Sequence, residues 1–186
     1  IGPAGYEQST NGSTFCLPCL TGTYQKETSS EKCKECPKGY SNGDTAAEDC
    51  AEGEPGRFNE LEKQAACKEC KAGKYSEKKG LDAENECLLC SAGTYSPTPG
   101  AKNQSTCTDC QPGKRGTEEG QSSSKIVCSD CGVGQYRSGD DQDMTTCLDC
   151  PSGRNSKGGA AVCSQCAAGR VQNSETKECV NCGRGK

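Results

Sequence analysis

The sequence predicts a small disulfide-rich fold, an elongated tandem array of short β-hairpin or irregular modules with little helix and no conventional core. Three observations predict this fold class. Apolar residues are too few to build a core, cysteines are abundant, and the cysteines recur as C-x-x-C pairs at a nearly constant spacing.

The shortage of apolar residues excludes an ordinary globular domain. Leu, Ile, Val and Phe together number 16 of 186 residues, and tryptophan is absent. Such a chain buries too little apolar surface to offset roughly 1–2 kcal/mol of backbone entropy per ordered residue. The 19 cysteines change that balance, because disulfides replace the missing core in small secreted proteins. We therefore expect an extracellular or cell-surface location, reached through the secretory pathway.

Charge and residue types exclude several classes of function. The net charge is −4, and the sequence has no stripe of basic residues that could bind a phosphate backbone. We therefore expect no nucleic acid partner. No apolar run approaches the roughly 20 residues that cross a bilayer, so we expect no membrane span in this segment. Histidine is absent, and no nucleophile lies near a base. We therefore expect no enzyme activity and no cofactor.

The C-x-x-C pair is the unit of a repeat. Nine complete pairs occur, and Cys50 opens a tenth whose second position holds Gly53. First cysteines follow one another at intervals of 16 to 21 residues, which is typical of tandem small units. All 19 cysteines are predicted disulfide residues, with one or more of them unpaired: Cys16, Cys19, Cys33, Cys36, Cys50, Cys67, Cys70, Cys87, Cys90, Cys107, Cys110, Cys128, Cys131, Cys147, Cys150, Cys163, Cys166, Cys179 and Cys182.

A glycine and an aromatic residue complete the repeat. Glycine lies three residues after every second-cysteine position, where we expect a positive φ or a close backbone approach. All six tyrosines lie just after such a glycine and begin an extended stretch, and we interpret them as packing residues. A polar loop and a second short strand then lead to the next pair. Residues 56–67 are the one candidate for a helical turn or two.

The repeats also predict how the chain is divided. Pro3-Ala4-Gly5-Tyr6 matches the later motif, which places Gly2 at a cysteine position, and the last repeat is unfinished. We therefore interpret the chain as a fragment of a longer protein. The predicted segments are 1–15 (a partial repeat), 16–49, 50–86, 87–127, 128–162 and 163–186 (a repeat and a partial repeat).

Metal binding and thiol redox chemistry are the alternatives to disulfides. Cysteine pairs at this spacing also satisfy a zinc-ribbon pattern of four thiolates. Disulfides are favoured because histidine is absent and because Gly53 breaks one pair without shifting its neighbours. Iron–sulfur ligation needs tighter clusters, and thioredoxin-type chemistry needs an α/β frame. We therefore expect no metal.

Two pairing schemes satisfy the spacing. In the serial scheme the second cysteine of one pair joins the first of the next, as in Cys70–Cys87. Each glycine at a cysteine position then leaves one specific thiol unpaired, Cys16 or Cys67. In the modular scheme adjacent pairs interlock, as in Cys87–Cys107, and only Cys70 lacks a partner. We favour the modular scheme, because a secreted chain with fewer orphan thiols is chemically safer.

Three further features are candidate sites. Asn11 and Asn103 begin N-x-S sequons in polar loops and are predicted N-glycosylation sites. The acidic stretch 139–143 lacks the spacing of a calcium loop, and we interpret it as a solvated turn. The odd cysteine count leaves a thiol that could cross-link chains.

The string C-x-x-C-x-x-G-x-Y-S resembles the ephrin-receptor-like cysteine-rich repeat, and it is similar to tumour-necrosis-factor-receptor-like and EGF-like modules. Residues 67–76, 87–96 and 16–24 match best. The resemblance covers nearly the whole chain and weakens at Gly53 and at Arg115, Asn155 and Val171, which replace the aromatic. It implies an extracellular rod of small disulfide-linked modules, and it implies no particular ligand.

We therefore predict a non-catalytic extracellular structural segment, a rod or stalk in a cell-surface coat or filament assembly. The expected partners are the neighbouring repeats, other copies of the chain or other surface proteins, with N-glycans attached. The alternative is a receptor ectodomain segment that binds a protein ligand.

Overall fold

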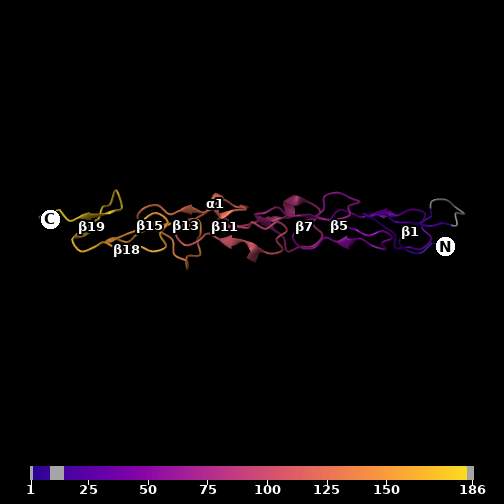
Figure 1. Cartoon of the computed structure of the whole chain (residues 1–186), viewed down its shortest axis with the longest axis horizontal. Helices are drawn as coiled ribbons and strands as arrows, with labels where there is room; N and C mark the ends of the chain where they lie inside the picture. The colour runs from indigo at the N-terminus through magenta and orange to yellow at the C-terminus, as the bar shows by residue number, and fades with distance from the viewer. Residues whose placement is uncertain (1, 9–14, 184–186) are drawn as a thin grey trace. The chain divides into compact units, whose positions relative to one another are not determined.

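The chain folds into short β-hairpins with almost no helix, which confirms the predicted fold class (Figure 1). The computed structural model of the chain describes residues 2–8 and 15–183. Consecutive strands pair into ten two-stranded sheets, β1 with β2 and so on to β19 with β20. The elements are β1 (Tyr6–Glu7), β2 (Leu17–Pro18), β3 (Thr23–Tyr24), β4 (Lys34–Glu35), β5 (Tyr40–Ser41), β6 (Ala51–Glu52), β7 (Arg57–Phe58), β8 (Lys68–Glu69), β9 (Lys74–Tyr75), the 3-10 turn η1 (Glu84–Glu86), β10 (Leu88–Leu89), β11 (Thr94–Tyr95), η2 (Gln104–Thr106), β12 (Thr108–Asp109), β13 (Lys114–Arg115), α1 (Ser124–Val127), β14 (Ser129–Asp130), β15 (Gln135–Tyr136), β16 (Leu148–Asp149), β17 (Arg154–Asn155), β18 (Ser164–Gln165), β19 (Arg170–Gln172) and β20 (Cys179–Asn181).

The chain divides into two compact units. The first comprises Ile1–Leu88 with Thr98–Thr106, and the second comprises Leu89–Pro97 with Cys107–Lys186. Both units are built from the same hairpin. In the first unit β3 pairs antiparallel with β4, so that Tyr24 lies opposite Lys34. In the second unit β13 pairs antiparallel with β14 in the same way.

The expected helical turn at residues 56–67 is wrong, because that stretch is β7 and the loop that follows it. Gly56 has a φ of +79°, which a helix does not accept. The helical turns are η1, η2 and α1, and each ends directly before a first cysteine: Cys87, Cys107 or Cys128. The bridges to these cysteines span 17 or 18 residues, the longest in the chain, so the helical turns take up the additional loop residues.

The motif glycines lie where a side chain has no room, as the sequence predicts. In the first unit Gly22 has a φ of +77°, and a Cβ built on it would overlap the carbonyl oxygen of Lys63. Lys63 belongs to the loop of the hairpin two places along the chain. In the second unit Gly113 has a φ of +82°, and its Cβ would overlap the carbonyl of Gly159. A left-handed backbone and a close backbone approach therefore both favour glycine.

Backbone hydrogen bonds join each hairpin to the next within a unit. The N–H of Cys36 donates to the Gly22 carbonyl at 2.9 Å, and the Gly22 N–H donates to the Asn42 carbonyl at 2.7 Å. In the second unit the N–H of Cys131 donates to the Gly113 carbonyl at 2.8 Å. Because these bonds recur at the motif positions, the main chain rather than apolar packing sets the spacing of the hairpins.

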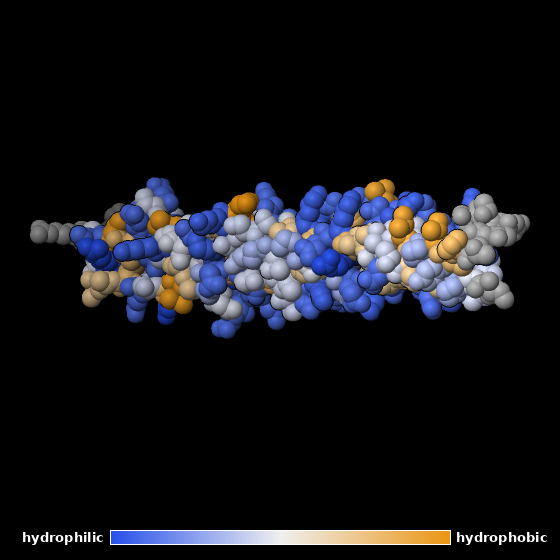
Figure 2. All heavy atoms as spheres, turned by 45° about the vertical axis from the view of Figure 1, so that its right-hand side comes forward, coloured by the Kyte–Doolittle hydropathy of each residue, from blue (hydrophilic) through white to orange (hydrophobic). Residues whose placement is uncertain are grey.

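The buried side chains are mostly cysteines and small polar residues. One apolar cluster, in the first unit, contains Phe58, Cys70, Leu81 and Cys87. On the face shown in Figure 2, apolar residues lie in small, separate groups among hydrophilic ones. Dispersed exposure of this kind is normal for a protein surface and does not by itself indicate an interface.

Candidate functional site

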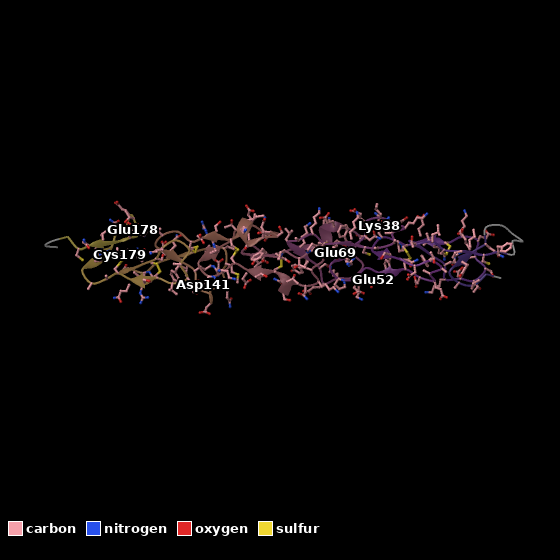
Figure 3. All side chains as sticks on the ribbon, in the orientation of Figure 1. Lys38, Glu52, Glu69, Asp141, Glu178 and Cys179 are labelled. Atoms are coloured by element: carbon pink, nitrogen blue, oxygen red, sulfur yellow. A yellow bond between two sulfur atoms is a disulfide. The ribbon has the colours of Figure 1, made fainter. Side chains whose placement is uncertain are left out.

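The disulfide frame is the feature on which the order of this chain depends. Eight bridges form, with Cα–Cα distances of 5.5–5.9 Å, and Figure 3 shows disulfides as yellow bonds. Each bridge joins the second cysteine of one pair to the first cysteine of the next. The bridges are Cys19–Cys33, Cys36–Cys50, Cys70–Cys87, Cys90–Cys107, Cys110–Cys128, Cys131–Cys147, Cys150–Cys163 and Cys166–Cys179.

The modular pairing scheme is therefore wrong, and the pairing is serial. The modular scheme leaves Cys70 without a partner, whereas Cys70 is bonded to Cys87. The reason is the turn at the motif glycine. Lys74 N–H donates to the Lys71 carbonyl at 3.1 Å, and this reversal brings Cys70 beside the start of the returning strand of its own hairpin. Each bridge thus closes one hairpin instead of linking two modules.

Three thiols are free, and two of them face glycines that occupy cysteine positions. Cys16 is half-buried, Cys67 is buried and Cys182 is exposed. A Cβ built on Gly2 would lie 2.8 Å from the Cys16 Sγ, and one built on Gly53 would lie 3.0 Å from the Cys67 Sγ. Cys16 and Cys67 are the thiols that the serial scheme leaves unpaired. Each of them and the glycine that it faces belong to one hairpin, which therefore has no bridge.

The backbone at Gly53 follows the path of a bridging cysteine. The Gly53 N–H donates to the Gly39 carbonyl at 2.8 Å, as the N–H of Cys36 does to the Gly22 carbonyl. The Gly53 carbonyl accepts from Gly80 N–H at 2.8 Å, again as in the bridged hairpins. The main chain of this repeat is therefore the same as in the bridged hairpins, although position 53 has no sulfur atom.

The hairpin of β7 and β8 has noncovalent contacts where it lacks a bridge. Phe58, 4% exposed, is the one buried aromatic side chain among residues 2–8 and 15–183. Across the two strands the Arg57 guanidinium lies 2.8 Å from the Glu69 carboxylate, and Lys68 lies 2.6 Å from Glu60. The Lys68 ammonium also lies 6.0 Å from the centre of the Phe58 ring. A buried ring and two ion pairs thus hold this hairpin, with most of the stabilisation from the ring, because exposed ion pairs contribute little.

A buried polar residue three positions after the motif glycine is a feature that the sequence analysis missed. In the first unit Asn59 Nδ2 donates to the Tyr40 carbonyl at 2.6 Å. In the second unit Ser156 Oγ donates to the Gln135 carbonyl at 2.6 Å. In both cases the side chain reaches back to the outgoing strand of the preceding hairpin. The signal is a recurrent polar residue at this position, which reads in the sequence as the first residue of a polar loop.

Arg137 occupies the same position in the second unit and is only 2% exposed. Its guanidinium donates to the carbonyls of Lys114, Cys110 and Gln111, the last at 2.8 Å. The corresponding residue of the preceding hairpin is Gly116, which has no side chain. The long arginine therefore bonds the main chain of a neighbouring hairpin with several donors at once, as charged groups in protein interiors require.

The predicted glycosylation and acidic sites have different outcomes. Asn11 lies outside the described residues. Asn103 is exposed and directly precedes η2. In the acidic stretch, the Thr145 hydroxyl and N–H and then the Thr146 hydroxyl donate to the Asp143 carboxylate and lower its pKa to about 2. No three acidic, cysteine or histidine side chains in the described part of the chain are grouped to hold a metal ion.

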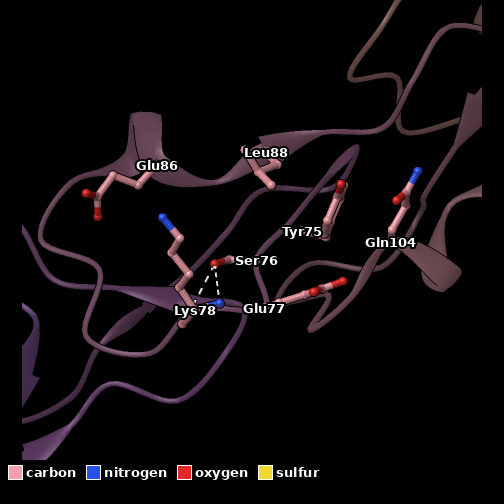
Figure 4. A pocket seen from close by; sticks show the side chains of 7 residues that line it. All are labelled: Tyr75, Ser76, Glu77, Lys78, Glu86, Leu88 and Gln104. Atoms are coloured by element: carbon pink, nitrogen blue, oxygen red, sulfur yellow. Dashed lines mark hydrogen bonds between the residues drawn. The ribbon is translucent and has the colours of Figure 1, made fainter.

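A groove of about 420 Å³ lies on the first unit beside β9 and β10. Volumes of this size are typical of small-ligand sites. We call it the Tyr75 groove, and Figure 4 shows the side chains that border it. Its lining includes one aromatic ring, one aliphatic side chain, two carboxylates, an ammonium and an amide: Tyr75, Leu88, Glu77, Glu86, Lys78 and Gln104.

The repeats that form these hairpins match a known family of cysteine-rich repeats. A family model described as tyrosine-protein kinase ephrin type A/B receptor-like matches residues 5–52 and 56–107, just over half of the chain. The two matched copies are separated at Gly53, Glu54 and Pro55, where the cysteine is missing. No curated protein shows a significant match to the chain. None of the described helices has the length and apolar character needed to cross a membrane.

Proposed function

Because the chain belongs to the ephrin-receptor-like family of cysteine-rich repeats, we propose that it is a non-catalytic extracellular spacer, a rod or stalk in a cell-surface coat or filament assembly. The observation that carries this proposal is the serial pairing. Every bridge closes a single hairpin, and the main-chain bonds of each hairpin go to its neighbours along the chain. Repeat arrays of this kind gain length by adding units, because each unit contacts only those near it.

The extracellular location is supported by the eight disulfides. Disulfides persist in oxidising compartments and are rare in the cytosol, where thiols are kept reduced. The small number of apolar residues supports the same conclusion, since this chain has little to hold it together once the bridges are reduced.

Small-angle X-ray scattering tests the spacer. A compact globule of this length has a radius of gyration of about 16 Å. We expect a clearly larger radius of gyration for the native chain. After full reduction, the radius of gyration should fall only if the chain collapses. A value near that of the globule would refute the proposal. Sedimentation over a wide concentration range then tests assembly, and a chain that stays monomeric throughout would confine the proposal to a single stalk.

The receptor-like description of the matching family favours a second candidate, an ectodomain segment that binds a protein ligand. The two candidates differ in what the purified chain captures. A spacer binds copies of itself or structural neighbours at high density, whereas a receptor segment retains one soluble ligand at stoichiometric amounts. Cross-linking on living cells followed by mass spectrometry separates these outcomes.

A further inference from the structure

The sequon at Asn103 and the Tyr75 groove lie side by side on the first unit. Gln104, the middle residue of the sequon, borders the groove, and Figure 4 shows it in the group of labelled side chains that includes Tyr75. The sequon is defined by the sequence and the groove by the surface, so neither feature implies the other. Their proximity gives the groove an occupant that belongs to this chain.

The side chain of Asn103 is placed for modification. It is exposed, and its Oδ1 accepts a hydrogen bond from the Ser105 hydroxyl at 2.6 Å. Its amide nitrogen has no hydrogen-bond partner among the described residues, so substitution there breaks no contact. The hydroxyl that makes a sequon a substrate is therefore already bonded to the amide that is modified.

The groove offers the chemistry that a sugar requires. The Tyr75 ring is half-buried and Leu88 is 55% exposed, which gives an apolar surface for the C–H face of a pyranose and for an acetamido methyl group. The Lys78 ammonium, the Glu77 carboxylate and the Gln104 amide have no side-chain partners among the described residues. Unpaired donors and acceptors around an apolar patch match sugar hydroxyl groups, which need both.

We propose that Asn103 carries an N-linked glycan whose first N-acetylglucosamine residues lie in the Tyr75 groove. This inference rests on the extracellular location proposed above. The donor is a lipid diphosphate-linked oligosaccharide of the secretory pathway. The Asn103 amide nitrogen bonds to C1 of the first sugar and loses one proton, while the bond from C1 to the phosphate oxygen breaks and the lipid diphosphate leaves with the electron pair.

Intact-mass measurement tests the attachment. The chain is secreted from eukaryotic cells in an Asn11→Gln background, which leaves one sequon, and its mass is measured before and after treatment with peptide N-glycosidase. We expect a glycan mass that is absent from Asn103→Gln and from Ser105→Ala. A secreted chain of unmodified mass overturns the proposal. The unreduced mass also counts the bridges, so a bridged chain without glycan contradicts only this inference, whereas an unbridged chain contradicts the extracellular proposal.

The rate of glycan release tests the docking. A sugar in the groove shields the bond that the glycosidase cleaves, so native Tyr75→Ala should release its glycan about two- to tenfold faster, the range expected for one aromatic contact. Tyr24→Ala is the matched control, because Tyr24 occupies the same repeat position in a hairpin of the first unit that carries no sequon and does not border the groove. Both variants should keep three titratable thiols, which shows that their bridges are intact. Equal release rates in the two variants overturn the docking.

Discussion

Gly53→Cys should complete the missing bridge of the β7–β8 hairpin. A Cβ built at this position lies 3.0 Å from the Cys67 Sγ and 3.9 Å from the Cys67 Cβ. Disulfides have Cβ···Cβ distances of about 3.5–4.5 Å, so the separation of the two Cβ atoms at this site is that of a bridge. The native bridges of the two preceding hairpins span 14 residues, the same separation as position 53 from Cys67.

The expected stabilisation follows from the loop that the new bridge closes. Closing about 15 residues removes roughly 3 kcal/mol of chain entropy from the unfolded state. Part of this gain is lost, because the new Cβ would also lie 3.0 Å from the Gly39 carbonyl oxygen. We therefore expect the free energy of unfolding of this hairpin to rise by about 2–3 kcal/mol.

Thiol titration and denaturant unfolding together check this expectation. The parent chain should show three reactive thiols after unfolding, and Gly53→Cys should show two although it has gained a cysteine. Gly53→Ala is the matched control, because it adds the Cβ without a sulfur atom and measures the steric cost alone. The reasoning is refuted if four thiols are titrated in Gly53→Cys, or if its added stability survives reduction.

Three further predictions concern the glycine turn, the buried arginine and the acidic loop. Gly169→Ala should lower the free energy of unfolding in urea by about 1–2 kcal/mol, because residue 169 has a left-handed backbone. Gly22→Ala should lower it by roughly 1–3 kcal/mol more, because of these two glycines only Gly22 has a backbone carbonyl against it. Equal losses in the two variants would contradict the close approach at Gly22. Arg137→Met should destabilise the second unit by about 2 kcal/mol or more, since it leaves buried carbonyls without donors, and a neutral change in urea unfolding would show that water replaces them. The Asp143 carboxyl should titrate by NMR near its lowered pKa of about 2 and shift toward 3.8 in Thr145→Ala. Because the folded-state pKa is depressed, the contribution of this loop to stability is present above pH 3.8 and is lost as the pH falls through about 2; a midpoint near 3.8 in the parent chain would remove the effect.

The repeat could be predicted from the sequence because its signals are local. The motif spacing places a glycine at each turn, and a positive φ at Gly22 follows from the residue type. The two-stranded form also follows, since a short extended stretch and a polar loop leave room for little else. Gly53 was correctly placed at a cysteine position because the rest of its motif is intact.

The pairing of the cysteines could not be predicted, because spacing alone is compatible with both schemes. The turn closed by Lys74 and Lys71 decides between them, because it sets which cysteines the chain reversal brings together, and the cysteine spacing does not report this. The role of Arg137 was missed for a related reason. Its guanidinium bonds carbonyls 23 to 27 residues earlier in the chain, and no local pattern reports such a distance.

The unbridged β7–β8 hairpin gives the array an extensible segment. Under tension, a bridged hairpin cannot lengthen between its two cysteines, because the sulfur–sulfur bond carries the load. The stretch from Gly53 to Cys67 has no such bond, and its 14 residues would extend to roughly 50 Å once the Phe58 ring leaves its cluster. The ring can return when the load is removed, so this hairpin would act as a reversible spring between bridged hairpins that cannot extend.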